Sequence, residues 1–334
     1  MILDGRSPQA IEQAARALRA GQLVAFPTET VYGLGADAGN DAAVAGIFEA
    51  KGRPSNHPLI VHVCAGAKGD EALSRFALPL PEFAMKLVHA FWPGPLTLIA
   101  PRQSGVGAAA AGGQDTIGLR CPSHPVAQAL LVACAEHGVA GLAGPSANRF
   151  GRVSPTTAAH VQGEFADTEL LIIDGGPCEV GIESTIVDVS RGVPVLLRPG
   201  LITRAQIEAA CGEKLRDRND LSAPDPRASG TLEAHYAPSA KVRLMDAKAI
   251  QAGLDVLGGE AAHIAVWSRA ELKSRSSRIL MRRMPQDAAA AAQLLFAVLR
   301  DFDAQGVKLI WVETPPDTHE WEGVRDRLQR AAAS

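Results

Sequence analysis

Four cationic side chains stand where a predicted helix or strand gives way to a loop. Lys51 and Arg53 follow a predicted helix that begins at Asp41, and Arg120 and Arg198 end two apolar runs. In an open α/β sheet such ends converge on one crevice. Several cations beside hydroxyl and amide groups favour a polyanion such as a nucleoside triphosphate. Each arginine alone is more often a surface ion-pair partner, so the prediction depends on their convergence.

Hydroxyl and amide side chains occupy further loops. The segment PTETVYGLG at 27–35 follows a buried apolar run, and GPSANRFGRVSPT at 144–156 supplies Ser146, Asn148 and a helix-start signal at Ser154. A helix N-terminus with free N–H groups attracts anions. The types and positions of these residues predict a phosphate-binding α/β enzyme.

Three other interpretations of these segments are weaker. Gly33 and Gly35 after a strand resemble a dinucleotide-binding loop, but alanine (Ala38) replaces the third glycine. The Walker pattern GxxxxGK[ST] is absent. Ser146 lies in GPSAN and not in the GxSxG of a hydrolase nucleophile, and no histidine or aspartate is tied to it by spacing.

Length and composition set the protein class. The chain has 334 residues, 47% apolar and 21% charged, and a net charge of 33 − 36 = −3. This allows about two domains and excludes dominant disorder or a uniformly basic nucleic-acid binder. We expect a cytoplasmic protein, because no apolar run approaches the ~18–20 residues of a membrane span and no signal core follows the start. Five cysteines without a CxxC pair favour free thiols and no protein-bound metal.

Apolar runs alternate with helical patterns, which predicts a layered α/β fold. Predicted strands lie at 23–26, 59–63, 96–100, 139–143, 170–174, 184–189, 193–198, 242–245, 263–267, 278–281 and 307–313. Predicted helices lie at about 8–20, 41–51, 124–138, 203–212, 286–305 and 319–333. The small-residue stretch at 105–113 is expected to form a mobile surface loop.

A change in composition and hydrophobic pattern at 213–240 predicts the domain boundary. This stretch is polar, contains several prolines and lacks periodicity, so it is either a plain tether or a flap over a functional site. We expect a catalytic domain at 1–212, the linker or flap at 213–240 and a C-terminal domain at 241–334.

Eight motifs occur in one order over about residues 9–240: PTETVYGLG, KGRPSNHPLIVHV, FWPGPLT, GLRCPSHP, GPSANRFGRVSPT, GIESTIVD, LLRPG and HYAP. The combination resembles the threonylcarbamoyl-AMP synthase family, whose catalytic module is the YrdC-like domain. The last third is similar to the extra domain of the family's long form. The resemblance implies a YrdC-like twisted mixed sheet with flanking helices, followed by a small Rossmann-like domain.

The resemblance also implies a reaction. L-threonine, bicarbonate and ATP would give threonylcarbamoyl-adenylate and pyrophosphate, with Mg²⁺ accompanying the ATP. The product would pass to a tRNA threonylcarbamoyl transferase complex that modifies adenosine 37 of tRNA. Direct contact with tRNA is expected to be weak.

Carried over position by position, the resemblance implies two sets of contacts. The ATP-binding set is Lys51, Arg53, His57, Thr116, Ser146, Asn148, Ser154, Arg198 and Tyr236. The threonine-binding set is Thr30, His62, Arg120, the backbone at Gly144, and Ser184. His57 stands where the family often has asparagine, and its ring can still donate one hydrogen bond.

Chemical roles follow from the residue types. Lys51 and Arg53 are the expected catalytic residues, because they would neutralise the phosphates and stabilise charge on the leaving group. Arg120 would clamp the threonine carboxylate. His62 is either a general base or a structural hydrogen-bonder, and Tyr236 would lie on a lid that closes over the nucleotide.

Two competing functions remain. The segment 269–283 holds six cations against one acid, which would suit an RNA-binding module acting on tRNA without adenylate synthesis. A carbamoyl-transfer protein of hydrogenase maturation also contains a YrdC-like domain, but the zinc-finger and acylphosphatase segments expected of it are absent here.

Overall fold

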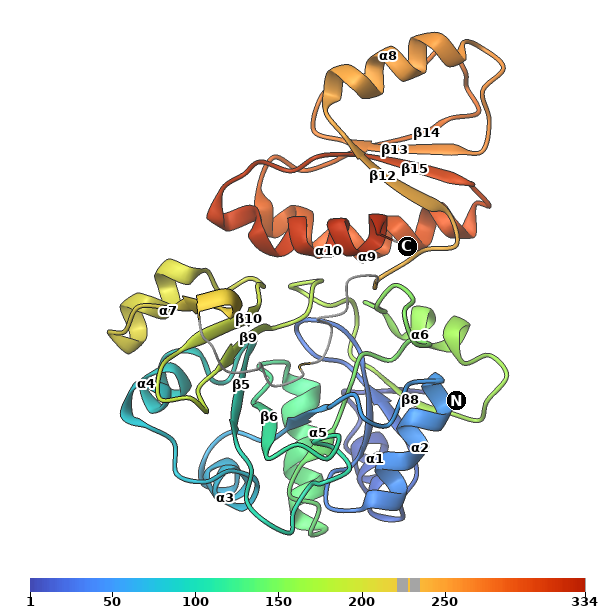
Figure 1. Cartoon of the computed structure of the whole chain (residues 1–334). Helices are drawn as coiled ribbons and strands as arrows, with labels where there is room; N and C mark the ends of the chain where they lie inside the picture. The colour runs from blue at the N-terminus through green and yellow to red at the C-terminus, as the bar shows by residue number, and fades with distance from the viewer. Residues whose placement is uncertain (221–227, 229–234, 334) are drawn as a thin grey trace. The chain divides into compact units, whose positions relative to one another are not determined.

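The computed structural model describes residues 1–220, 228 and 235–333, and the chain divides into two compact units (Figure 1). The first unit comprises residues 1–150 and 154–231, and the second comprises 151–153 and 232–334. The described part of the predicted linker is therefore shared between them. Residues 221–227 and 229–234 lie outside the described residues, so the flap at 213–240 stays a prediction.

A mixed sheet forms the framework of the first unit. Its described strands run in the order β1-β8-β2-β3-β7-β4-β6-β5-β9-β10-β11, with parallel and antiparallel neighbours. The strands are β1 Ile2–Asp4, β2 Val24–Phe26, β3 Gly33–Asp37, β4 Ile60–His62, β5 Leu96–Pro101, β6 Thr116–Arg120, β7 Leu142–Ala143, β8 Leu171–Asp174, β9 Thr185–Asp188, β10 Val195–Arg198 and β11 Arg216–Asp217. The predicted twisted mixed α/β sheet is confirmed.

Helices flank this sheet, and local capping explains where several begin and end. They are α1 Pro8–Arg19, α2 Asp41–Lys51, α3 Ala67–Phe76, α4 Glu82–Phe91, α5 Pro125–Glu136, α6 Ala158–Glu164 and α7 Arg204–Cys211, with a 3₁₀ turn η1 at Arg218–Asp220. Asn40 caps α2, which ends at Gly52 in the left-handed region with φ 64°. This positive φ turns the chain directly after Lys51.

The hairpin of β2 and β3 replaces the loop suggested by Gly33 and Gly35. The two strands pair antiparallel, and a Cβ on Gly33 or Gly35 would lie 3.0 Å from the ring of Phe26. These glycines are present because an aromatic ring covers the strand. The resemblance to a dinucleotide-binding loop was therefore misleading.

Two local expectations were wrong. Within 105–113, Ala110 and Ala111 are fully buried, and the Ala110 carbonyl accepts a hydrogen bond from the Leu59 amide at 2.7 Å. The stretch thus docks on the core instead of forming a free surface loop. The helix after Ser154 begins later than predicted, because Thr157 is the residue that caps α6.

The second unit contains a four-stranded parallel sheet in the order β12-β15-β13-β14. Its elements are β12 Lys241–Met245, α8 Ala247–Leu257, β13 Ile264–Ser268, β14 Leu280–Arg283, α9 Ala288–Ala304, β15 Leu309–Glu313, a 3₁₀ turn η2 at His319–Trp321 and α10 Glu322–Ala332. Helix α8 covers one face of the sheet, and α9 and α10 cover the other (Figure 1). This layering confirms the predicted small Rossmann-like domain.

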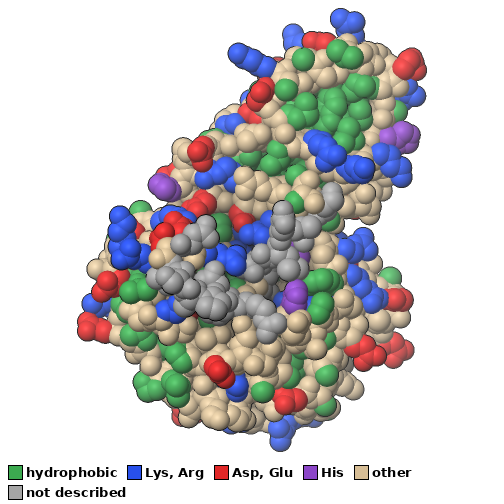
Figure 2. Space-filling view, in the orientation of Figure 1, with side chains coloured by type: hydrophobic (Ala, Val, Ile, Leu, Met, Phe, Trp, Pro, Cys, Tyr) green, Lys and Arg blue, Asp and Glu red, His purple; other side chains and the backbone are tan. Residues whose placement is uncertain are grey.

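No described helix has both the length and the apolar character needed to cross a membrane. On the face shown in Figure 2, basic and acidic side chains are interspersed over the first unit and do not form a field of one sign.

Candidate active site

Lys51 joins the end of α2 to the loop that follows β7. Its side chain is buried, and Nζ donates to the carbonyl oxygen of Ser146 at 2.6 Å and to that of Asn148. Burial, together with the charge of Arg53, holds the pKa of Lys51 well below its usual value, although Glu164 opposes this. The segment that carries Lys51 and Arg53 therefore meets the segment that carries Ser146 and Asn148 through this lysine.

Phe150 gathers two further members of the predicted ATP-binding set. The Arg53 guanidinium lies 5.7 Å from the centre of the Phe150 ring, and the His57 ring meets the same ring edge-on at 5.6 Å. The Phe150 amide donates to the carbonyl oxygen of Lys51 at 2.8 Å. Arg53 also donates to the Pro58 carbonyl at 3.0 Å. Lys51, Arg53, His57, Ser146 and Asn148 thus form one cluster.

Arg120 is the centre of a second buried cluster. Its Nη1 donates to the Thr30 hydroxyl at 2.8 Å, and its Nη2 lies 2.8 Å from Oε1 of Glu29 in an ion pair whose side chains are both 4% exposed. The Thr30 hydroxyl lies 2.9 Å from that of Thr28. The guanidinium is therefore held in one orientation by groups on the loop after β2.

His62 lies beside Arg120, because the two residues are in register on the parallel strands β4 and β6. A Cβ on Gly144 would lie 3.0 Å from Nδ1 of His62, so the absence of a side chain at Gly144 leaves space against the ring. Burial, reinforced by the charge of Arg120, lowers the pKa of His62 to about 3. The ring is neutral at physiological pH, and such a low pKa argues against a general base.

Ser184, directly before β9, and Arg198, at the end of β10, form a third cluster. Arg198 donates from Nε and Nη2 to the Ser184 carbonyl at 3.1 and 2.9 Å, and from Nη2 to the Ser184 hydroxyl at 3.1 Å. The Ser184 hydroxyl also lies 2.7 Å from that of Thr97. The bonds between Arg198 and Ser184 join a residue predicted to bind ATP to one predicted to bind threonine.

Main-chain bonds tie the loops of these clusters together. The amide of Leu34 donates to the carbonyl of Pro145, and the amide of Tyr32 donates to that of Pro155. Gly33 and Ser146 form an isolated β-bridge. The segment after β2, which carries Glu29 and Thr30, is thereby connected to the segment anchored by Lys51.

Three predicted residues make other contacts or lie elsewhere on their element. The Ser154 hydroxyl bonds to Oε1 of Glu183 at 2.5 Å. Thr116 opens β6, whereas Arg120 closes it, so the two are separated by roughly 13 Å along the strand. Tyr236 belongs to the second unit, where its buried ring packs against Phe296 with ring centres 5.3 Å apart. Its predicted nucleotide contact stays a prediction.

The sequence alone did not single out Glu29, Thr97, Phe150 or Glu183. Glu29 could have been noticed as a carboxylate between two hydroxyl residues directly after a buried strand. Phe150 and Thr97 carry no comparable signal, because their importance arises only from contacts with residues distant in sequence.

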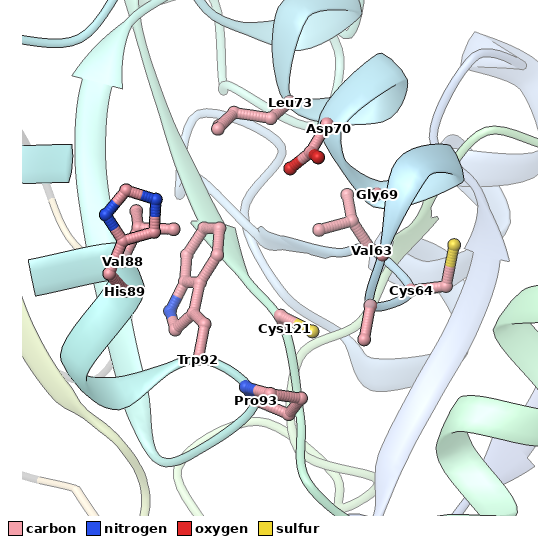
Figure 3. Close-up of a pocket in the computed structure, with 12 residues that line it drawn as sticks. Val63, Cys64, Gly69, Asp70, Leu73, Val88, His89, Trp92, Pro93 and Cys121 are labelled. Atoms are coloured by element: carbon pink, nitrogen blue, oxygen red, sulfur yellow. The ribbon is translucent and has the colours of Figure 1, made fainter.

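A separate cavity of about 210 Å³ lies in the first unit (Figure 3). Val63 and Cys121 directly follow His62 and Arg120 in sequence and line it, together with Trp92 and Pro93. None of the predicted ATP- or threonine-binding residues lines this cavity.

The arrangement suits anionic and zwitterionic ligands. Lys51, Arg53, Arg120 and Arg198 are all buried, which favours the binding of anions because buried cations gain most from charge neutralisation. Among the described residues, no three histidine, cysteine or carboxylate side chains gather where they could hold a metal ion.

Comparisons with known proteins cover both units. A family model described as "Telomere recombination" (Sua5_yciO_yrdC) matches residues 16–200. A second, described as "Threonylcarbamoyl-AMP synthase, C-terminal domain" (Sua5_C), matches residues 202–333.

Relatives match over nearly the same extent. The threonylcarbamoyl-AMP synthase of Bacillus subtilis is 39% identical over 99% of this chain and 94% of its own length, and that of Pyrococcus abyssi is 38% identical over 96% and 94%. A crystal structure of P. abyssi Sua5 complexed with L-threonine matches with a TM-score of 0.87 and 36% identity, over 99% of this chain and 97% of that one. The chain therefore belongs to the threonylcarbamoyl-AMP synthase family.

Proposed function

We propose that this protein is an L-threonylcarbamoyladenylate synthase, which converts L-threonine, bicarbonate and ATP into threonylcarbamoyl-AMP and pyrophosphate. The observation that carries this proposal is the burial of Lys51, Arg53, Arg120 and Arg198 within one unit of a chain that is 36% identical to a threonine-complexed Sua5. A buried cationic site of this kind suits the two anionic reactants, ATP and bicarbonate.

ATP is assigned to the cluster around Lys51. Lys51 and Arg53 would face the phosphates, and the Ser146–Asn148 loop would be held in place by the Lys51 ammonium. Thr116, Ser154, Arg198, His57 and Tyr236 complete the proposed set of nucleotide contacts. As negative charge grows on departing pyrophosphate, the two cations would stabilise it.

Threonine is assigned to the cluster around Arg120. The N–H groups of Arg120 would bind the carboxylate, and the backbone at Gly144 would approach the substrate closely. The hydroxyls of Thr30 and Ser184 and the neutral ring of His62 would orient the amine and the side-chain hydroxyl. Positioning of this kind lowers the barrier without a dedicated base.

The proposed reaction has two bond-forming steps. The α-ammonium group of threonine first loses a proton to solvent, and the freed nitrogen lone pair forms a bond to the bicarbonate carbon. The C–OH bond of bicarbonate breaks, and its hydroxyl leaves as water with a proton from the nitrogen to give the carbamate. A carbamate oxygen then bonds to the α-phosphorus while the bond from that phosphorus to the pyrophosphate oxygen breaks. The bonding electrons leave with pyrophosphate, beside Lys51 and Arg53.

A magnesium ion is expected to travel with the nucleotide. Because the described residues lack a cluster of three metal-ligating side chains, phosphate oxygens and water would supply most of its ligands. Glu183, bonded to Ser154, is a carboxylate next to one of the proposed nucleotide contacts and would hold the ion on the protein side. The bound ion would neutralise phosphate charge.

The product is a mixed anhydride, which water hydrolyses readily. We propose that it is passed to a tRNA threonylcarbamoyl transferase complex in the cytoplasm for transfer to adenosine 37 of tRNA. Supporting this is the reaction class, since an activated acyl group requires an acceptor.

The decisive experiment is mass spectrometry of the product after incubation with ATP, L-threonine and bicarbonate. The threonylcarbamoyl-AMP mass and threonine-dependent pyrophosphate release are expected. Both signals should fall at least ~100-fold in Lys51→Ala and Arg53→Ala, and should persist in Lys68→Ala, which alters an exposed lysine on α3. Full activity in the first two variants would refute the assignment of catalytic residues.

The RNA-binding alternative receives no support from the segment 269–283. Three of its arginines are already paired with acids of the second unit. The pairs are Arg269–Glu313 at 2.7 Å, Arg278–Glu260 at 3.0 Å and Arg282–Asp301 at 2.8 Å. Salt-dependent tRNA binding without ATP turnover would revive this alternative.

A further inference from the structure

Glu29 has a buried carboxylate oxygen without a hydrogen-bond partner. The residue is 3% exposed, and only Oε1 is engaged, in the ion pair with Nη2 of Arg120. Oε2 has no partner among the residues that the structure describes. Leaving a buried charged acceptor unsatisfied costs more free energy than a neutral one, so this oxygen calls for an explanation.

The surroundings of Arg120 indicate what Oε2 would receive. Besides the ion pair, the guanidinium donates to the Thr30 hydroxyl at 2.8 Å and, at 3.4 Å, to the Gly94 carbonyl. Two of its five N–H groups remain for a ligand carboxylate. One cation and one anion therefore stand side by side, which is the charge pattern complementary to a zwitterionic amino acid.

A second buried polar atom without a hydrogen-bond partner lies on the residue next to Arg120 in the sheet. Nδ1 of His62 has no hydrogen-bond partner among the described residues, and it faces the backbone of Gly144. His62 is in register with Arg120 on the neighbouring strand. Two unsatisfied polar atoms around one arginine are expected when a ligand supplies the missing partners.

Other buried carboxylates of the first unit have different partners. Asp37 accepts from the Gly39 amide, Glu164 from the Arg149 amide, Glu183 from the Ser154 hydroxyl, and Asp188 from Ser190 while pairing with Arg191. Glu29 is thus distinguished by its ion pair with a residue of the proposed threonine-binding set.

We propose that Glu29 is a positioning residue that receives the α-ammonium group of the amino-acid substrate on Oε2, while its Oε1 keeps Arg120 oriented toward the substrate carboxylate. This inference rests on the proposed function, because it assigns a contact within the threonine site. It makes the site selective for free amino acids over hydroxy acids that lack the amine.

Calorimetric titration of the full chain with L-threonine and with (R)-3-hydroxybutyrate, the same skeleton without the amine, tests this. Wild-type protein is expected to bind threonine roughly 10- to 100-fold more tightly. In Glu29→Gln, threonine affinity should fall by about that factor and 3-hydroxybutyrate affinity should change by less than about 3-fold. Glu29→Asp should recover part of the discrimination, and Glu179→Gln, which alters an exposed glutamate nearby, should keep all of it.

Each contrary outcome has a distinct meaning. Equal affinities of the wild type for the two ligands would overturn the inference even if Glu29→Gln failed to fold. Equal losses for both ligands in Glu29→Gln would also overturn it, because Glu29 would then act only through Arg120. A wild-type protein that binds no threonine and releases no pyrophosphate would instead refute the proposed function.

Discussion

Lys51 Nζ donates to the Ser146 carbonyl at 2.6 Å, across 95 positions of sequence. The lysine therefore serves the fold and the proposed nucleotide site at once: it fixes the loop that carries Ser146 and Asn148, and it keeps a cation buried where phosphates would bind. Burial disfavours the protonated form of this amine, so a neighbouring phosphate would stabilise the ammonium and gain in binding free energy from it.

Replacing Lys51 with methionine should impair the use of ATP while leaving the binding of threonine almost unchanged. The variant should lose at least ~100-fold in pyrophosphate release and roughly 1–3 kcal/mol in unfolding free energy, because the loop carbonyls lose their donor. Threonine affinity should change by less than about 3-fold, since that site is centred on Arg120. Steady-state kinetics, urea denaturation and threonine calorimetry measure the three effects. An equal loss of threonine affinity would mean that the two clusters behave as one.

ATP binding should be coupled to proton uptake by Lys51. Burial holds the pKa of this amine well below its usual 10.5, and a neighbouring triphosphate would raise it again. At pH values between the lowered pKa and 10.5, Lys51 lacks a proton in the free protein and holds one in the ATP complex.

Calorimetry in two buffers with different ionisation enthalpies, at a series of pH values below 10.5, should therefore show uptake of up to one proton over part of that range. In Lys51→Met, proton uptake on ATP binding should be smaller than in the wild type by the amount that Lys51 takes up. Without ATP, the unfolding free energy attributable to Lys51 should rise with pH across this window, because the unfolded chain binds the extra proton there. Identical proton uptake in wild type and variant would exclude Lys51 as the group concerned.

Local signals in the sequence account for the elements that were predicted well. Helix α2 spans Asp41–Lys51 as expected, because Asn40 caps its start and Gly52 ends it. Helix α7 follows a capping box between Thr203 and Gln206, also as expected. In both cases the determining groups lie within a few residues of the boundary.

Features that depend on distant partners were not predictable from the pattern. The burial of Ala110 depends on its bond to Leu59, and the strand character of the glycine-rich β3 depends on Phe26. Likewise, the ion pair of Glu29 with Arg120 joins two motifs that only the sheet order brings together. The sequence supplied the candidate cations; the tertiary fold determines which groups they meet.

Acid should destabilise the protein through His62. Its pKa is about 3 in the folded state against 6.5 ordinarily, so between these values the unfolded chain binds a proton that the folded chain does not. The unfolding free energy should fall as pH decreases below about 6.5, by about 2–3 kcal/mol from this group at pH 4.5. Urea denaturation from pH 7 to 4.5 should show a shallower loss in His62→Gln. Parallel pH profiles of the unfolding free energy for the two proteins would show that His62 does not contribute to the destabilisation by acid.

Gly35→Ala should destabilise the hairpin that leads into the threonine site. The new Cβ would lie 3.0 Å from Cε1 of Phe26 and 3.2 Å from the Val24 carbonyl, so the ring or the strand must move. Overpacking of this kind costs about 1–3 kcal/mol of unfolding free energy. In a Phe26→Leu background the penalty should shrink, and a double-mutant cycle measures the coupling.

Gly46→Ala provides the matched control for that substitution. Gly46 lies within α2, where the nearest atom to an added Cβ would be 3.8 Å away on Leu23. A glycine-to-alanine change inside a helix with room for the methyl group should stabilise the protein by about 0.5–1 kcal/mol. Opposite signs for the two substitutions would establish that the ring of Phe26, and not a general preference for glycine, dictates the composition of β3. Stabilisation by Gly35→Ala would contradict this account, since the hairpin would then tolerate a side chain at the position where Phe26 is packed.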